Sequence, residues 1–199
     1  MNLINSDCLV ELKNLPDKSI NFFYLDLPYG QTAMRWDKKI DLKLLWVQLK
    51  RLAKNERTPF FFSCTTKFGY DLIKSNEKYF RWDLVWEKNR ASGFLNCYKL
   101  PMRKHELIYC FAKKSPEYDV SSHKDVKKTI YKTVQPPIDM YGSERTVHKT
   151  THKERLPTSV LTEQSIPSSW IKCDVDTKTN HRTSKPVTLM EFLLKYWTK

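Results

Sequence analysis

The sequence predicts an α/β fold, in which helices alternate with the strands of a sheet. Short apolar runs such as residues 60–64 have the length of buried strands, and the segments between several of them repeat apolar residues at helical spacing. Strands that alternate with helices of this length indicate a parallel sheet. At 199 residues, the chain is long enough for one domain with a substantial core.

Most of these elements fall within the first 114 residues. Strands are predicted at 2–5, 21–27, 60–64, 82–86 and 105–111, and helices at 9–15, 41–55 and 68–77. The helix at 41–55 has the clearest pattern, because its apolar residues form one stripe: Leu42, Leu45, Trp46, Leu49, Leu52 and Ala53.

From Lys113 to about Ser169 the sequence turns basic and polar, with little periodicity. Such a segment is either disordered or an irregular binding insertion. A last helix follows, with Thr183 or Ser184 as its cap and Pro186 in its first turn.

The net charge of +13, combined with 13% aromatic residues, makes nucleic acid the first partner to consider. The five cysteines (Cys8, Cys64, Cys97, Cys110 and Cys173) are scattered and form no Cys-x-x-Cys pair, so neither a disulfide framework nor a metal site is expected. No apolar run approaches the ~20 residues that span a bilayer. The sequence therefore predicts a cytoplasmic protein without a membrane segment.

The run Asn21 to Gly30 is an apolar strand that ends abruptly in Asp26, Leu27, Pro28 and Tyr29. A carboxylate at a strand tip accepts a hydrogen bond from an exocyclic amine, the next carbonyl accepts a second, and an aromatic ring stacks on an extruded base. This ending suits chemistry on a flipped-out base. The alternative is an ordinary strand-to-loop turn that contains a proline.

The same four residues resemble the Asp-Pro-Pro-Tyr motif of the DNA amino-methyltransferases, which methylate adenine N6 or cytosine N4 from S-adenosylmethionine. Leu27 departs from this motif, although it keeps the carbonyl acceptor, and Pro28 still favours an extended backbone at Leu27. The resemblance implies that Asp26, Leu27, Pro28 and Tyr29 are the catalytic residues.

Three further segments carry the resemblance, at 5–20, 86–106 and 180–190. The first places Asp7 and Cys8 beside the cofactor. The last is similar to a His-Pro-Thr-Gln-Lys-Pro segment, and it implies that Lys185 and Pro186 contribute to the cofactor pocket. Arg182 and Ser184 depart from that pattern.

The resemblance covers 1–114 and 179–199, and it implies a methyltransferase core with a returning helix. Residues 115–178 are then a basic target-recognition insertion, in which Lys124, Lys127 and Lys128 contact double-stranded DNA. Arg90 and Phe94 are further candidate DNA contacts, although Phe94 is equally compatible with a core position.

Family members with this motif order also carry a Phe-x-Gly-x-Gly loop for the cofactor. The four glycines here (Gly30, Gly69, Gly93 and Gly142) are never two positions apart. We therefore expect an incomplete Rossmann-like methyltransferase sheet with helices on both faces and an irregular basic insertion. The missing segment comes from a second polypeptide, or the chain is a truncated relative.

Two functions stay open at this stage. One is a DNA methyltransferase that uses S-adenosylmethionine, and the Asp at the first motif position favours adenine N6 over cytosine N4. The other is a catalytically silent DNA-binding remnant that keeps the base pocket and the basic surface.

Overall fold

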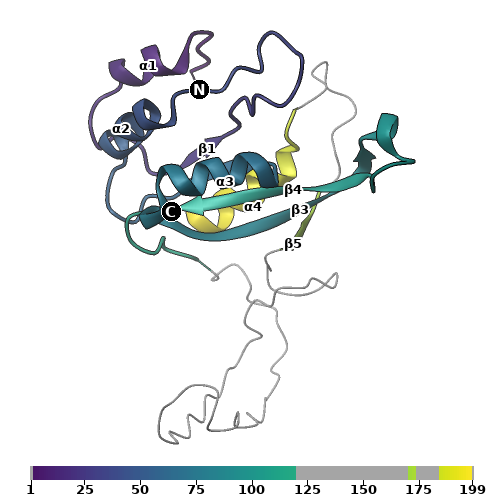
Figure 1. The fold of residues 1–199 in the computed structure, drawn as a ribbon. Coiled ribbons are helices and arrows are strands. Elements are labelled where there is room, and N and C mark those ends of the chain that lie inside the picture. Colours follow the sequence, from purple (N-terminus) through teal and green to yellow (C-terminus); the bar gives the residue numbers. More distant parts are fainter. Residues whose placement is uncertain (1, 120–169, 174–183, 199) are drawn as a thin grey trace, which may run out of the picture.

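The computed structural model describes residues 2–119, 170–173 and 184–198. They form a five-stranded sheet in the order β1-β2-β4-β3-β5, with helices on both faces (Figure 1). The strands are β1 (Phe23–Leu25), β2 (Phe60–Cys64), β3 (Phe80–Ser92), β4 (Arg103–Phe111) and β5 (Trp170–Lys172). The α/β class and the two helical layers expected from the sequence are confirmed.

The strand directions are mixed, so the expectation of a parallel sheet is wrong. Strand β1 runs parallel to β2, and β5 runs parallel to β3, but β4 is antiparallel to both of its neighbours. The reason is that β3 and β4 are consecutive and joined by a hairpin, which forces neighbouring strands to run in opposite directions.

The α-helices are α1 (Cys8–Asn14), α2 (Leu42–Leu52), α3 (Thr66–Ser75) and α4 (Val187–Trp197), with short 3-10 turns η1 (Glu77–Tyr79) and η2 (Phe94–Asn96). Side-chain caps start three of them: Asp7 accepts from the Leu9 amide, Asp41 from the Lys43 and Leu44 amides, and Thr65 from the Phe68 amide. Helix α4 instead begins after Pro186, which provides no side-chain cap. Of the two predicted cap residues, Ser184 is not the residue that precedes the helix, and Thr183 lies outside the described residues.

Two apolar cores lie on opposite faces of the sheet. Because side chains alternate along a strand, β2 presents Phe60 and Phe62 to one face and Phe61 to the other. The first core packs against α2 and α3, and the second packs against α4 through Leu189 and Leu193. The final helix therefore closes the sheet face that the earlier helices leave open.

The predicted strand at residues 2–5 does not form. Leu3 is 85% exposed and Ile4 is 61% exposed, and neither pairs with a strand among the described residues. Strand β1 is thus the edge of the described sheet, which leaves one side of its backbone unpaired in the described part of the chain.

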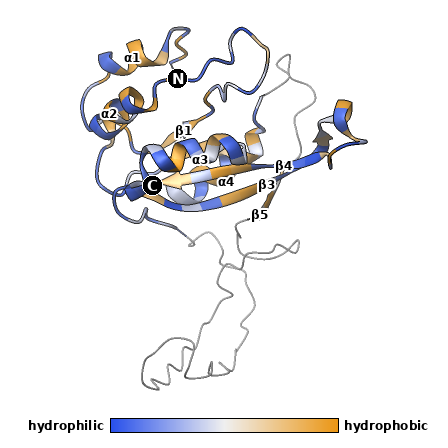
Figure 2. Ribbon diagram, viewed as in Figure 1, coloured by the Kyte–Doolittle hydropathy of each residue, from blue (hydrophilic) through white to orange (hydrophobic). Residues whose placement is uncertain are grey.

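Strands β3 and β4 continue past the sheet as a hairpin arm, which projects to the right in Figure 1 and ends in η2. Its tip is apolar yet exposed: Phe94 is 74% exposed, Leu95 95% and Tyr98 100%. Figure 2 shows hydrophobic and hydrophilic segments next to each other there. None of the helices within the described ranges has the length and hydrophobicity needed to cross a membrane.

Candidate active site at the sheet edge

The register of the strands brings distant residues to one edge of the sheet. Asp26 follows the last residue of β1, whose Leu25 is paired with Phe62 of β2. Cys64 at the end of β2 is in turn paired with Leu107, next to Glu106 near the start of the antiparallel strand β4. Asp26 and Glu106 therefore lie at the same edge, beyond the carboxyl ends of β1 and β2, where ligands bind in open α/β sheets.

Both oxygens of the Asp26 carboxylate have a partner. Oδ2 accepts a hydrogen bond from the Lys185 ammonium at 2.9 Å, and Oδ1 accepts one from the Tyr29 hydroxyl at 3.3 Å. The Asp26 side chain is 38% exposed, so it remains open to a ligand. The carboxylate is thus both held in position and accessible.

The Tyr29 ring is fixed from one side. It stacks on Phe68 of α3 with ring centroids 5.1 Å apart and an interplanar angle of 29°. Burial, reinforced by the negative charge of Asp26, raises the pKa of the Tyr29 hydroxyl far above its ordinary value, so the hydroxyl stays protonated and donates. A second ring can stack on Tyr29 only from the face opposite Phe68.

Asp37 holds the loop that follows these residues. Its carboxylate accepts from the amides of Gly30, Gln31 and Thr32 at 2.7, 2.9 and 2.7 Å, and from the Thr32 hydroxyl at 2.7 Å. The Thr32 hydroxyl and these amides lower the pKa of Asp37 to about 2. Gly30 has φ +64°, a left-handed conformation that suits glycine. Sequence reasoning missed this role of Asp37, because an Asp in a loop gives no sign of the amides it accepts from.

A chain of alternating charges extends from Asp26 into the sheet. Lys185 Nζ lies 3.4 Å from Glu106 Oε2, and Glu106 Oε1 accepts from Lys88 Nζ at 3.1 Å. The Lys185 and Lys88 side chains are only 13% and 12% exposed. Lys88 and Glu106 lie in segments that carry the family resemblance, but nothing in the sequence indicates that they connect to Asp26.

The other predicted site residues are placed as follows. Leu27 packs its side chain against the core on the α2 and α3 face, and Pro28 is half-buried. Asp7 accepts from the Leu9 amide at 2.8 Å and so caps α1, while Cys8 is exposed on α1 with its thiol pKa raised by partial burial. Pro186 is buried where α4 begins.

The predicted DNA contacts fall in two places. Arg90 and Phe94 are exposed on the hairpin arm, so Phe94 is not a core residue. Lys124, Lys127 and Lys128 lie outside the described residues. The structure therefore brings Asp26, Tyr29 and Lys185 together, and places Arg90 and Phe94 on a separate arm of the same sheet.

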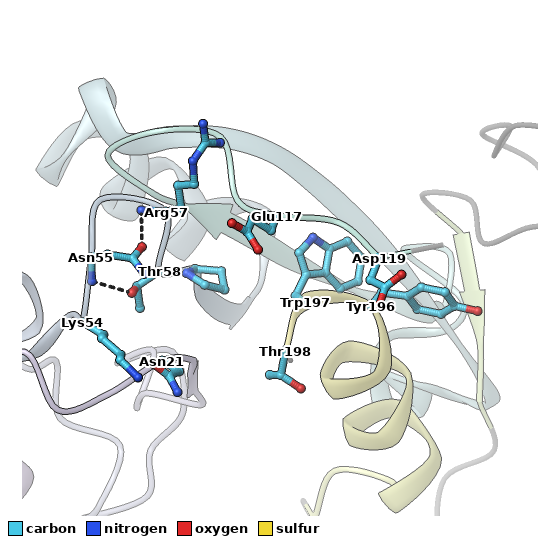
Figure 3. Close-up of a pocket in the computed structure, with 11 residues that line it drawn as sticks. Asn21, Lys54, Asn55, Arg57, Thr58, Glu117, Asp119, Tyr196, Trp197 and Thr198 are labelled. Atoms are coloured by element: carbon cyan, nitrogen blue, oxygen red, sulfur yellow. Dashed lines mark hydrogen bonds between the residues drawn. The ribbon is translucent and has the colours of Figure 1, made fainter. Parts of the chain in front are cut away.

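A pocket of about 240 Å³ lies at the opposite edge of the sheet (Figure 3). Its lining includes Asn21 and Pro59, which precede β1 and β2, and Trp197 at the end of α4. Figure 3 shows Arg57 and Glu117 at its upper rim. Asp26 follows the carboxyl end of β1, whereas this pocket lies at the amino ends of β1 and β2, so the two sites are separate.

Comparisons with known proteins bear on the family and the fold of this chain. A family model described as DNA methylase of the N6/N4 type matches residues 20–199. The structure titled PvuII DNA methyltransferase, cytosine-N4-specific, has a TM-score of 0.57 and 11% identity, covering 98% of this chain and 69% of that one. The crystal structure of an M1.HpyAVI–SAM complex has a TM-score of 0.48 and 17% identity, covering 96% and 72%. No curated protein matches the sequence. At 11% identity the PvuII structure supports the fold alone.

Proposed function

Because this chain belongs to the N6/N4 DNA methylase family, we propose that it transfers a methyl group from S-adenosylmethionine to the exocyclic N6 of adenine in double-stranded DNA. The observation that carries this proposal is the accessible Asp26 carboxylate, held beside Tyr29 beyond the end of β1. An Asp at the first motif position is typical of adenine enzymes in the family that the sequence resembles.

The chemistry follows from the weakness of the amine as a nucleophile, since its lone pair is delocalised into the ring. Asp26 accepts one N–H of the amine, and the Leu27 carbonyl accepts the other. Both acceptors stabilise the positive charge that develops on the nitrogen as the methyl group arrives. Tyr29 stacks on the extruded base through the face that Phe68 leaves open. No covalent intermediate with the protein is needed, because positioning supplies most of the remaining rate.

The cofactor supplies a methyl group on a positively charged sulfur. The residues present fit the ribose end of this cofactor. Asp7 is exposed, and its described hydrogen bond uses only Oδ1, so Oδ2 can accept a hydrogen bond from a ribose hydroxyl. We assign Cys8, next in sequence, and Pro186, at the start of α4, to the same proposed cofactor pocket. Lys185 contributes there through its contact with Asp26.

The DNA surface comprises the hairpin arm and the basic segment 115–178. Between Asn89 and His105 the chain carries four Lys or Arg residues and no acid, which suits a phosphate backbone: Arg90, Lys99, Arg103 and Lys104. We assign Arg90 to phosphate contact and Phe94 to stacking, while Lys124, Lys127 and Lys128 provide further phosphate contacts.

A further polypeptide segment completes the cofactor side in this proposal. Its site in this proposal is the outer edge of β1, which pairs with no other strand among the described residues. An unpaired apolar edge is a ready place for an added strand. Such a segment would also supply the glycine loop for which the four glycines of this sequence are too far apart.

Methyl transfer to unmethylated genomic DNA tests the proposal. The full chain, with any completing segment, is incubated with isotopically labelled S-adenosylmethionine, and the DNA is digested for mass spectrometry of its nucleosides. We expect labelled N6-methyladenine. Labelled N4-methylcytosine would replace the adenine assignment, and the absence of both would favour a silent DNA-binding protein.

The matched variants are Asp26→Ala and Asp71→Ala. Asp26→Ala should abolish transfer but leave DNA affinity nearly unchanged, because it removes an amine acceptor and no phosphate contact. Asp71 lies on α3 in an ion pair with Lys39 at 2.7 Å, so its removal should leave transfer intact. Equal activity in both variants would remove Asp26 from the mechanism.

A further inference from the structure

The Lys185 ammonium occupies the acceptor that the target amine requires. Its Nζ lies 2.9 Å from Asp26 Oδ2, and Tyr29 donates to the other oxygen of the same carboxylate. A target amine that donates to Asp26 must therefore share this carboxylate with a buried cation or displace it. An ammonium kept there also opposes the stabilisation of positive charge on the amine nitrogen.

Glu106 offers Lys185 a second acceptor. Its Oε1 accepts from Lys88, whereas its Oε2 is buried and has no hydrogen-bond partner among the described residues. A buried carboxylate oxygen without a partner is unusual and requires an explanation. The Lys185 Nζ lies 3.4 Å from this oxygen, only 0.5 Å more than its distance of 2.9 Å to Asp26.

We propose that Lys185 alternates between two positions: it donates to Asp26 in the resting site and to Glu106 Oε2 when the target amine is bound. Glu106 is then a positioning residue that acts through Lys185, and it vacates Asp26 for the amine. This inference rests on the proposed function, because it names the event that opens the Asp26 site to substrate.

The charges of the cluster make such a movement feasible. Two cations, Lys88 and Lys185, face two carboxylates, Asp26 and Glu106, so the lysine stays paired in either position. A buried ammonium that left Asp26 without a new acceptor would be an unpaired buried charge, which is strongly destabilising. Glu106 Oε2, already 3.4 Å from the ammonium, supplies this acceptor.

A folding experiment without DNA tests the movement directly. Lys185→Met, Glu106→Gln and the double variant form a thermodynamic cycle, measured by urea unfolding of the full chain in the Asp26 protein and again in Asp26→Ala. Removal of Asp26 should send Lys185 to Glu106. The coupling between Lys185 and Glu106 in the unfolding equilibrium should then increase at least fivefold, which is about 1 kcal/mol. The same coupling in both backgrounds would overturn the proposal.

Lys114 and Glu56 provide the control cycle, because their ion pair at 2.5 Å involves none of the four cluster residues. Their coupling should not depend on Asp26. If a cluster variant does not fold, the ¹³C shift of the Glu106 carboxylate replaces the cycle. This shift should differ between the wild-type chain and Asp26→Ala, and the difference should disappear when Lys185→Met is added to Asp26→Ala. A shift that is insensitive to Lys185 would contradict the movement.

Kinetics separate this role from a structural one. Glu106→Gln leaves Lys185 on Asp26, so we expect kcat to fall about tenfold with little change in duplex affinity. In a Lys185→Met background, the same Glu106→Gln change should cause no further loss of kcat, because Glu106 then has no ammonium to hold. Losses that multiply would overturn the proposal. A wild-type chain without methyl transfer would refute the proposed function instead, and the folding cycle would still decide the movement.

Discussion

Asp37 shows how one buried carboxylate orders the residues next to the candidate site. It is 7% exposed and accepts three backbone amides and one hydroxyl from residues 30–32. These bonds hold the loop that immediately follows Tyr29. Since misplacement by about 1 Å can cost ~100-fold in rate, Asp37 matters to the chemistry although it lies outside the motif.

The lowered pKa of Asp37 predicts a pH dependence of the stability. Its folded pKa of about 2 lies below the unfolded value of roughly 3.9, so its contribution is present above pH ~4 and is lost as the pH falls toward 2. In Asp37→Asn, the free energy of unfolding should depend less on pH in this window.

Acid titrations of urea unfolding, compared between wild type and Asp37→Asn, measure this change. Glu56 also has its pKa lowered to about 2, by hydrogen bonds from Lys113 and Lys114, and it contributes in the same window with the same sign. Glu56→Gln is therefore the matched variant. If Asp37→Asn left the acid dependence unchanged while Glu56→Gln flattened it, the loop role of Asp37 would be wrong.

Among the elements, the β3–β4 hairpin combines features that rarely serve stability. Its tip exposes Phe94, Leu95 and Tyr98, and its arms carry exposed Arg90 and Arg103. Exposed rings between cations are typical of surfaces that stack on bases and contact phosphates. The hairpin therefore belongs to the DNA interface in our proposal.

Replacement of Arg90 tests this element. Arg90→Ala should weaken duplex binding and reduce the slope of log affinity against log salt by about one unit, as one phosphate contact is lost. Lys78, exposed on η1 just before the start of the same strand β3, is the control. Fluorescence anisotropy over a salt series measures both variants. Identical slopes for Arg90→Ala and Lys78→Ala would exclude a phosphate contact at Arg90.

At the scale of the whole molecule, the charge of +13 predicts binding to DNA that depends strongly on salt. Neutralising Lys124, Lys127 and Lys128 together should flatten that dependence by roughly one slope unit for each lost phosphate contact. The same anisotropy measurement applies, with the wild-type chain as reference. An unchanged slope would show that these lysines are solvated surface.

The unpaired edge of β1 predicts how the whole chain binds its cofactor. The 199-residue chain alone should bind S-adenosylmethionine weakly in calorimetric titration, and a segment that pairs with β1 and supplies a glycine loop should strengthen binding. A micromolar dissociation constant for the isolated chain, equivalent to about −8 kcal/mol, would mean that the site is already complete.

The sequence by itself determined the local features of this protein. The Asp41 cap and the apolar stripe after it predict α2, the run 60–64 predicts β2, and the order of Asp26, Pro28 and Tyr29 indicates the base site that we propose. Each depends on residues that are close in the chain, where spacing and chain chemistry suffice.

Only the tertiary structure decided which distant residues meet. Asp26 and Lys185 are separated by 159 positions, and Glu106 reaches them because β4 runs antiparallel to β2. The β3–β4 hairpin makes the sheet mixed rather than parallel, and it places Phe94 at an exposed tip. Strand direction and side-chain pairing depend on long-range contacts that no local pattern encodes, so the charge cluster beside Asp26 is visible only in the folded chain.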